Sequence, residues 1–227
     1  MKKEASCQTP FCFALPGQSQ PPARGATAAI VLIVWFALVF LLGARGAFVT
    51  PPGTPPLPIL IGFLTPILAF FTGWRTSRAF RAFVLDVDLR LATAIQAWRF
   101  AGLGFLALYV HGVLPGFFAW PAGLGDIAIG VTAPWIILAL IRQPGFAAGK
   151  PFMVWNLLGI LDLIVALGTG VLGSGLAVGI VGETTTGPMA QLPLVLIPAY
   201  FVLIFIMLHA AALIQGRHLA RDSSQQA

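Results

Sequence analysis

The sequence predicts an all-α membrane protein with six transmembrane helices, both termini in the cytoplasm and an amphipathic helix at the membrane interface before the third span. Hydrophobic residues form 58% of the 227-residue chain and charged residues only 9%, whereas about a quarter of the residues are charged in a soluble domain. Charge-poor stretches of about 20 residues, enough to cross a bilayer core as a helix, recur along the chain. No soluble fold of this length could bury so much apolar surface.

Six apolar stretches account for the predicted spans. The proline-rich connection ARGAFVTPPGTPP, residues 44–56, separates the first two because it cannot continue either helix. Residues 91–141 are too many for one crossing, and the breaker-rich segment LPGFFAWPAGLGD, residues 114–126, is predicted to divide them. The predicted spans are residues 26–43, 57–74, 92–113, 124–141, a fifth from Pro151 to about Gly173, and 192–215.

The basic residues set the predicted orientation. If the N-terminus is cytoplasmic, 11 of the 13 Lys and Arg residues lie on the cytoplasmic side, Arg45 lies outside and Arg99 lies within a span. This distribution follows the positive-inside rule, so both termini are predicted to be cytoplasmic. The net charge of +6 therefore reports topology and gives no indication of nucleic-acid binding.

Two tails flank the predicted transmembrane domain of residues 26–215. Residues 1–25 mix Pro, Gln, Gly and Ser without periodicity, which predicts a flexible cytoplasmic tail, and residues 216–227 form a second cytoplasmic tail. Cys7 and Cys12 are expected to be free thiols, because no second Cys or His pair stands nearby to complete a metal site.

Two connections have patterns of their own. In RTSRAFRAFVLDVDLRL, residues 75–91, apolar residues from Phe80 to Leu91 recur on one helical face, which predicts a short helix on the inner membrane surface. The end of this segment alternates as a strand would, but an isolated strand there has no partner. The connection 173–191 is rich in Gly and Thr, and the sequence leaves open whether it is mobile or dips back toward the membrane.

One carboxylate interrupts the fifth span. In GILDLIVALGTG, residues 159–170, Asp162 lies on a stripe of small residues that includes Gly159 and Ala166. Small residues let another helix approach closely. A lone ionised Asp at the bilayer centre costs about 2.5–3.5 kcal/mol, so Asp162 is expected to be protonated or paired. Arg99 is the predicted partner, since it is the one basic residue within a span that stays charged.

Helical spacing and depth predict two polar clusters. On the third span Gln96, Arg99 and His111 share one side with Ala107, so this side is expected to face protein. Counted from the inner ends of the spans, Asp162 lies near the midplane and His209 is shallow. The predicted inner and central cluster contains Gln96, Arg99, Asn156, Asp162 and His209. The predicted outer cluster contains His111 and Asp126, which would meet across the hairpin between the third and fourth spans.

The sequence supports two functions for these groups. The pair of Asp162 and Arg99 is either a structural lock between two spans or part of a proton or ion relay or a substrate contact. The chain is therefore predicted to be a small-solute or ion transporter, proton-linked, with a non-transporting scaffold or accessory subunit as the alternative. The expected partners are the lipid bilayer, a small solute or ion, and a second copy of the chain packed through small-residue helix faces.

Motifs for catalysis are missing from the sequence. HExxH, GxSxG and GxxxxGKS/T do not occur, so no catalytic residue is predicted and an enzyme has no support. A haem held by His111 and His209 is disfavoured because their expected depths differ by about 20 Å. We expect no cofactor, no metal and no nucleic-acid partner.

Three stretches carry a resemblance. LPGFFAWPAGLGD (114–126), WNLLGILDLIVALGTG (155–170) and MAQLPLVLIPAY (189–200) resemble segments of small, uncharacterised bacterial membrane proteins with several spans. The resemblance extends over residues 90–215. It implies a location in the bacterial inner membrane, and it implies no activity and no functional residues.

Overall fold

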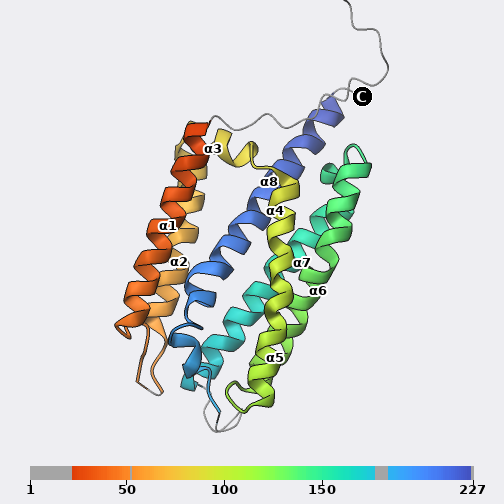
Figure 1. Ribbon diagram of the computed structural model, residues 1–227. Coiled ribbons are helices and arrows are strands. Elements are labelled where there is room, and N and C mark those ends of the chain that lie inside the picture. Colours follow the sequence, from red (N-terminus) through yellow and green to blue (C-terminus); the bar gives the residue numbers. More distant parts are fainter. Residues whose placement is uncertain (1–21, 52, 177–183, 226–227) are drawn as a thin grey trace, which may run out of the picture.

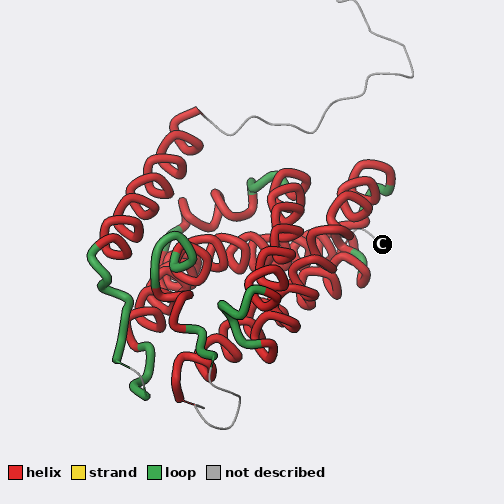
Figure 2. The backbone as a smooth tube through the Cα atoms, turned by 60° about the horizontal axis from the view of Figure 1, so that its bottom comes forward, coloured by secondary structure: helices red, strands yellow, loops and turns green. Residues whose placement is uncertain are grey.

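The computed structural model describes residues 22–51, 53–176 and 184–225, and these residues form helices and no strands (Figure 2). Six of the helices in this part of the chain are long and apolar enough to cross a membrane, which confirms the predicted all-α fold with six membrane-crossing helices. The spans are α1 (Pro22–Ala44), α2 (Leu57–Thr76), a third made of α4 (Leu89–Gln96), η1 (Ala97–Gly102) and α5 (Leu103–Val110), then α6 (Gly116–Arg142), α7 (Lys150–Val171) and α8 (Val202–Gln225). The short α3 (Arg78–Leu85) precedes the third span.

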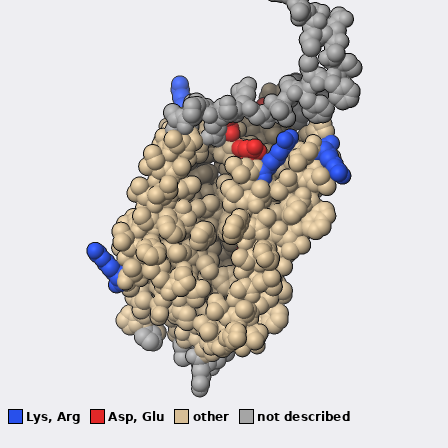
Figure 3. Space-filling model, viewed as in Figure 1, with Lys and Arg blue, Asp and Glu red and all other residues tan. Residues whose placement is uncertain are grey.

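The six spans run along one common direction (Figure 1). In this view α8 lies in the middle, with α1 and α2 on one side and α4, α5, α6 and α7 on the other. The start of α1 and the end of α8 lie at the same end of the bundle, which we call the terminal end; the opposite end is the distal end. Most of the Lys and Arg side chains visible in Figure 3 gather at the terminal end.

The predicted helix before the third span is present as α3. Its first turn is capped by Ser77, whose side chain accepts a hydrogen bond from the Phe80 amide at 3.2 Å. Asp88 then caps α4 by accepting from the Arg90 amide at 2.8 Å. Val84 is buried, and the Gln215 side chain of α8 donates to its carbonyl at 2.8 Å. The helix is thus fastened to the last span, and it ends at Leu85, earlier than the apolar pattern predicts.

The third span changes its helical period at the middle. Residues 97–102 form a 3₁₀ helix, in which side chains three apart lie on one line. From Thr93 onward the buried residues recur every third position: Thr93, Gln96, Arg99, Gly102 and Phe105. The predicted polar side was drawn with the α-helical period, so it is correct for Gln96 and Arg99 and wrong beyond them, where Ala107 and His111 are exposed.

The fourth span begins earlier than predicted. The helix α6 starts at Gly116, so the segment expected to separate two spans is mostly the first part of a span. Pro121 and Pro134 both lie inside this helix, a position that transmembrane helices tolerate because neighbouring groups satisfy the freed backbone carbonyls. The actual turn lies between α5 and α6, where Gly112 adopts a positive φ of 70°. This shift moves Asp126 from the outer end of the predicted fourth span, residues 124–141, to the middle of a helix.

The last span is longer than predicted. It opens with a π-helical turn over Ile197–Phe201 and α8 continues to Gln225, so residues 216–225 extend the helix. A second π-helical turn, Leu172–Leu176, follows α7. Tyr200 in the first of these turns donates a hydrogen bond to the Leu32 carbonyl at 3.1 Å and thereby ties α1 to the last span. Cys7, Cys12 and residues 177–183 of the connection 173–191 lie outside the described residues.

Candidate functional site

A buried arginine joins three spans. The Arg99 side chain is fully buried, and its Nε donates to Asp126 Oδ1 on α6 at 2.7 Å. Its Nη2 donates to Asp162 Oδ2 on α7, which is the pairing that the sequence predicts. Its Nη1 donates to the Gly159 carbonyl at 3.3 Å and lies 3.2 Å from His209 Nε2 on α8. A single guanidinium therefore binds two carboxylates, one carbonyl and one imidazole.

The hydrogen-bond chain continues from Arg99 through His209 toward the terminal end of the bundle. A guanidinium can only donate, so His209 Nε2 accepts and the ring is a neutral imidazole with its proton on Nδ1. Nδ1 then donates to Asn156 Oδ1 at 2.8 Å, and Asn156 Nδ2 donates to the Phe152 carbonyl at 2.8 Å. Every polar atom of these side chains has a partner, so this part of the network is closed.

Glycines make room for the polar side chains. A Cβ added to Gly159 would collide with the His209 ring, one added to Gly125 with the Asp162 carboxylate, and one added to Gly102 with Asp126. Gly130 lies against the backbone of Arg99 and Phe100, which brings α6 next to the 3₁₀ segment. The small-residue stripe of α7 is thus used inside the chain, and its members Gly159 and Gly173 are buried.

The network lies halfway along the spans. Asp126 follows the start of α6 by ten residues, about 15 Å of helix, and Asp162 follows the start of α7 by twelve, about 18 Å. His209 contacts Arg99 and is central as well, not shallow as predicted from a span ending at residue 215. The central cluster, defined as Arg99, Asp126, Asp162 and His209, is therefore placed where an unbalanced charge costs most.

The charges of the central cluster do not cancel. Arg99 contributes one positive charge, His209 is neutral, and Asp126 and Asp162 contribute two negative charges when both are ionised. One excess negative charge in a low-dielectric surrounding is unfavourable. The cluster becomes neutral when it takes up one proton or one other monovalent cation.

A cavity of about 310 Å³ reaches the central cluster from the distal end. Asp126 lines it, together with side chains from α2, α5, α6, α7 and the start of the last span. The walls are largely apolar and include Ile59, Phe105, Phe118, Leu163, Ala166 and Pro198. The surface is hollowed along the seam between the α1 and α2 side and the third span (Figure 3). The cavity falls within the size range of small-molecule sites.

The described part of the connection 173–191 closes one wall of this cavity. Thr186 is buried, its amide donates to the Gly173 carbonyl at 2.8 Å, and its hydroxyl donates to the Gly170 carbonyl at 2.6 Å. Met189, three residues on, is buried against Phe118 and other residues of α5 and α6. Residues 184–191 thus fold back into the bundle, which is one of the two arrangements that the sequence left open. Both π-helical turns also contribute lining residues, Ser174 and Ile197.

The structure does not bring His111 and Asp126 together. His111 follows the last turn of α5 and is exposed at the distal end, whereas Asp126 binds Arg99. The predicted outer cluster is thus wrong, because the fourth span begins at Gly116 and not near residue 124, which places Asp126 about 15 Å along α6. Asp126 is the one residue of the central cluster that sequence reasoning assigned elsewhere. The charge of Asp126 could have placed it correctly. Arg99 is the only Arg that the sequence places within a span, so a second intramembrane carboxylate has no other guanidinium to pair with.

Gln96 lies near the central cluster without joining it. Its Nε2 donates to the Phe205 carbonyl at 3.1 Å, and the Phe205 ring lies 5.9 Å from the Arg99 guanidinium carbon. Its Oε1 is buried and has no hydrogen-bond partner among the described residues. Of the predicted inner cluster, Arg99, Asn156, Asp162 and His209 form one continuous network, and Gln96 contacts it through Phe205.

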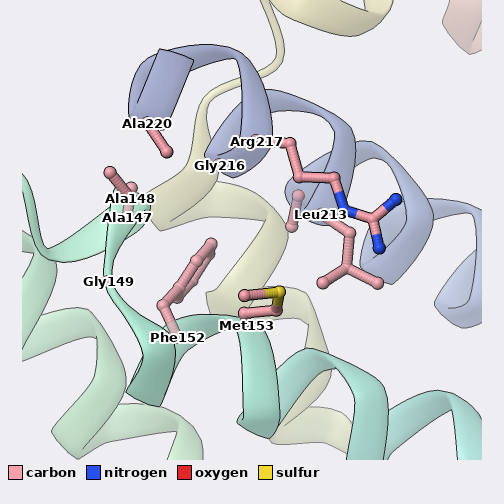
Figure 4. A pocket seen from close by; sticks show the side chains of 10 residues that line it. Ala147, Ala148, Gly149, Phe152, Met153, Leu213, Gly216, Arg217 and Ala220 are labelled. Carbon is pink, nitrogen blue, oxygen red and sulfur yellow. The ribbon is translucent and has the colours of Figure 1, made fainter. Parts of the chain in front are cut away.

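A second cavity, of about 40 Å³, lies at the terminal end between the start of α7 and α8 (Figure 4). Phe152, Met153 and Leu213 line it, with the Arg217 side chain beside them. It is apolar and far smaller than the sites that hold small molecules. The cavity next to Asp126 is therefore the candidate site.

These features define a multi-pass helical membrane protein with an ion-pair cluster halfway along its spans and a cavity that opens onto that cluster. Residues 56–215 match the family described as Domain of unknown function (DUF8737), and the chain belongs to this family. The match extends from the residue before α2 into α8, so it includes all four residues of the central cluster and leaves out α1. No curated protein and no solved structure matches the chain.

Proposed function

We propose that this protein is a proton-linked transporter of a small solute in the bacterial inner membrane. The observation that carries the proposal is the cavity of about 310 Å³ that ends on Asp126, a carboxylate that shares one guanidinium with Asp162. The cavity offers room for the solute, and the excess carboxylate offers a place for the proton. Solute and proton would thus meet at the same carboxylate.

The alternative, a scaffold with a purely structural ion pair, explains less of the site. A structural lock needs one carboxylate for one guanidinium and is best served by a filled interior. Here a second carboxylate is present, and it faces a cavity. A scaffold function predicts that neutralising Asp126 or Asp162 alters stability and moves no other measurable property.

The proposed orientation places both termini in the cytoplasm and the cavity on the outer side. It rests on the basic residues of the connections at the terminal end, including Arg75, Arg78, Arg142 and Lys150. A reporter enzyme that is active only after export, fused after Ala227, should be silent, whereas the same reporter fused within residues 51–55 should be active. The reverse pattern would contradict the orientation.

Proton movement in proteoliposomes tests the transport function. Purified protein would be reconstituted with a pH-sensitive dye inside the vesicles, and neutral, anionic and cationic small solutes would be added to the outside in turn. We expect one chemical class to move protons across the membrane. Asp126→Asn and Asp162→Asn should abolish this signal, and Asp222→Asn, which removes an exposed carboxylate outside the central cluster, should leave it unchanged.

The test also separates transport from a scaffold role. The transport function is wrong if two results are obtained with folded, reconstituted wild-type protein. No class of solute evokes proton movement, and labelled members of each class do not enter the vesicles. The same result with stability changes in Asp126→Asn and Asp162→Asn would favour the scaffold.

A further inference from the structure

We propose that the solute is a monovalent organic cation with an apolar body, bound in the cavity with its charge on the Asp126 carboxylate in exchange for one proton. The proposal rests on the transport function for its physiological meaning, but the binding reaction can be measured without transport. Three features of the site support it: a cavity-lining carboxylate with one oxygen that accepts no hydrogen bond from the described residues, apolar and aromatic walls, and the charge balance of the central cluster.

Asp126 has acceptor capacity to spare. Its Oδ1 accepts from Arg99 Nε, while its Oδ2 accepts no hydrogen bond from any described residue. The side chain is 16% exposed, and Asp126 is the one charged residue among the described residues that line the cavity. Since neither Lys nor Arg is among them, an anionic solute would find no opposite charge on these walls. An organic cation, in contrast, would find an opposite charge in the Asp126 carboxylate, one oxygen of which is not engaged by Arg99.

The walls favour an organic cation over a metal ion. Phe105 and Phe118 line the same cavity as Asp126 and lie edge to face, with ring centroids 5.4 Å apart, and aromatic faces attract alkylammonium groups. Leu163 and Leu167 add aliphatic surface that an apolar body could cover. A metal ion needs several oxygen or nitrogen ligands at once, and no group of three His, Cys, Asp or Glu side chains in the described residues could supply them.

The charge balance makes proton and cation compete. The groups that face Asp126 and Asp162 are Arg99 from the third span and, through Arg99, His209 from α8. His209 uses both ring nitrogens in hydrogen bonds, so the two carboxylates are the groups left to take up a proton. With one proton the cluster is neutral, and a bound cation restores the same balance only if that proton leaves. One cation should therefore release one proton.

Isothermal titration of the detergent-purified, full-length protein tests this exchange. The probe is phenyltrimethylammonium, with its neutral isostere tert-butylbenzene and the anion benzenesulfonate as controls. We expect the cation to bind and benzenesulfonate to show no binding. Titrations in buffers of different ionisation enthalpy should report release of about one proton per cation, and affinity should fall up to about tenfold for each pH unit of acidification, because the proton competes.

Variants then locate the site. Asp126→Asn removes the carboxylate of the cavity and should weaken binding of the cation at least tenfold. Asp162→Asn leaves that carboxylate in place but balances the cluster, so it should weaken binding less and abolish proton release. Asp222→Asn should match the wild type. If any variant fails to fold, Ala166→Phe, which narrows the cavity from α7 and leaves every carboxylate in place, should also weaken binding.

Three results would overturn the proposal: equal affinity for the neutral isostere and the cation, cation binding without proton release, or unchanged binding in folded Asp126→Asn. Binding with proton release in a protein that moves no protons across vesicles would retain the cation site and reject transport. Proton movement evoked by neutral or anionic solutes alone would retain transport and reject the cation.

Discussion

The halves of the bundle on the terminal and distal sides of the central cluster differ in how they use polar groups. On the side toward the terminal end, the chain from Arg99 through His209 to Asn156 ends on a backbone carbonyl, and the His209 ring fits against Gly159 without spare room. On the side toward the distal end, the bundle holds a cavity of about 310 Å³, and Asp126 keeps one oxygen free of hydrogen bonds from described residues. The central cluster forms the boundary between a closed half and an open one.

This difference shows which polar groups are structural and which are available for binding. A buried group whose donors and acceptors are all satisfied stabilises one arrangement and has no capacity left for a ligand. His209 and Asn156 are of this kind, and Asp126 is not. The structure therefore corresponds to a state in which the central cluster communicates with the distal end and is sealed from the terminal end.

The largest expected effect on stability comes from removing both carboxylates of the central cluster. Arg99 has two carboxylate partners, so Asp126→Asn or Asp162→Asn alone leaves it paired and should change stability little. The double variant leaves a buried guanidinium without a counter-charge, so its free energy of unfolding should fall by about 3–5 kcal/mol. Adding Arg99→Gln to the double variant should recover much of this loss.

Thermal unfolding of the detergent-solubilised variants measures this non-additivity. Because the two carboxylates share one guanidinium, the stability loss of the double variant should be far larger than the sum of the losses in the two single variants. Strictly additive losses would mean that the two carboxylates act independently, and the account of the central cluster would have to be abandoned.

A matched pair of glycines compares the two halves directly. A Cβ at Gly159 would collide with the His209 ring, so Gly159→Ala should destabilise the protein by about 1–3 kcal/mol. A Cβ at Gly170, on the cavity side of the same helix, would meet only the Phe118 ring at 3.5 Å, an ordinary contact. Gly170→Ala should therefore be neutral or slightly stabilising. Equal unfolding temperatures for the two variants would contradict a closely packed half on the terminal side of the central cluster.

The smallest effect on stability is expected from filling the cavity. Ala166 lines the cavity from α7 and is partly buried, and Ala166→Phe adds a ring where space already exists. We expect the free energy of unfolding to stay within about 1 kcal/mol of the wild-type value. Solute-driven proton movement in proteoliposomes should be reduced. Full activity in the folded variant would show that the cavity is not on the route.

The sequence predicts the fold well because span length and charge are local properties. Six spans are present, and Asp162 binds Arg99 as expected, since each is the costliest group to leave alone in hydrocarbon. The helical position of Asp126 could not be predicted in the same way. Pro115, Gly116 and Pro121 indicate a loop in water, but in a transmembrane helix their backbone cost is offset by neighbouring groups.

The register of the third span could not be predicted either. The 3₁₀ segment follows from tertiary packing, because Gly130 of α6 lies against the backbone of Arg99 and Phe100. No residue within Ala97–Gly102 itself indicates the change from the α-helical to the 3₁₀-helical period. The cavity is likewise a property of how the start of the last span and residues 184–191 fold back, and helical periodicity carries no information about either.

The central claim is that two carboxylates sharing Arg99 hold one exchangeable proton. Infrared spectroscopy tests it most directly, because the carbonyl stretch of a protonated carboxylic acid is distinct from the bands of a carboxylate. Near neutral pH the wild type should show this band and lose it on adding phenyltrimethylammonium, while Asp126→Asn and Asp162→Asn, in which the remaining carboxylate balances Arg99, should lack it. A folded wild type without the band, or with a band that persists in both variants, would contradict the claim.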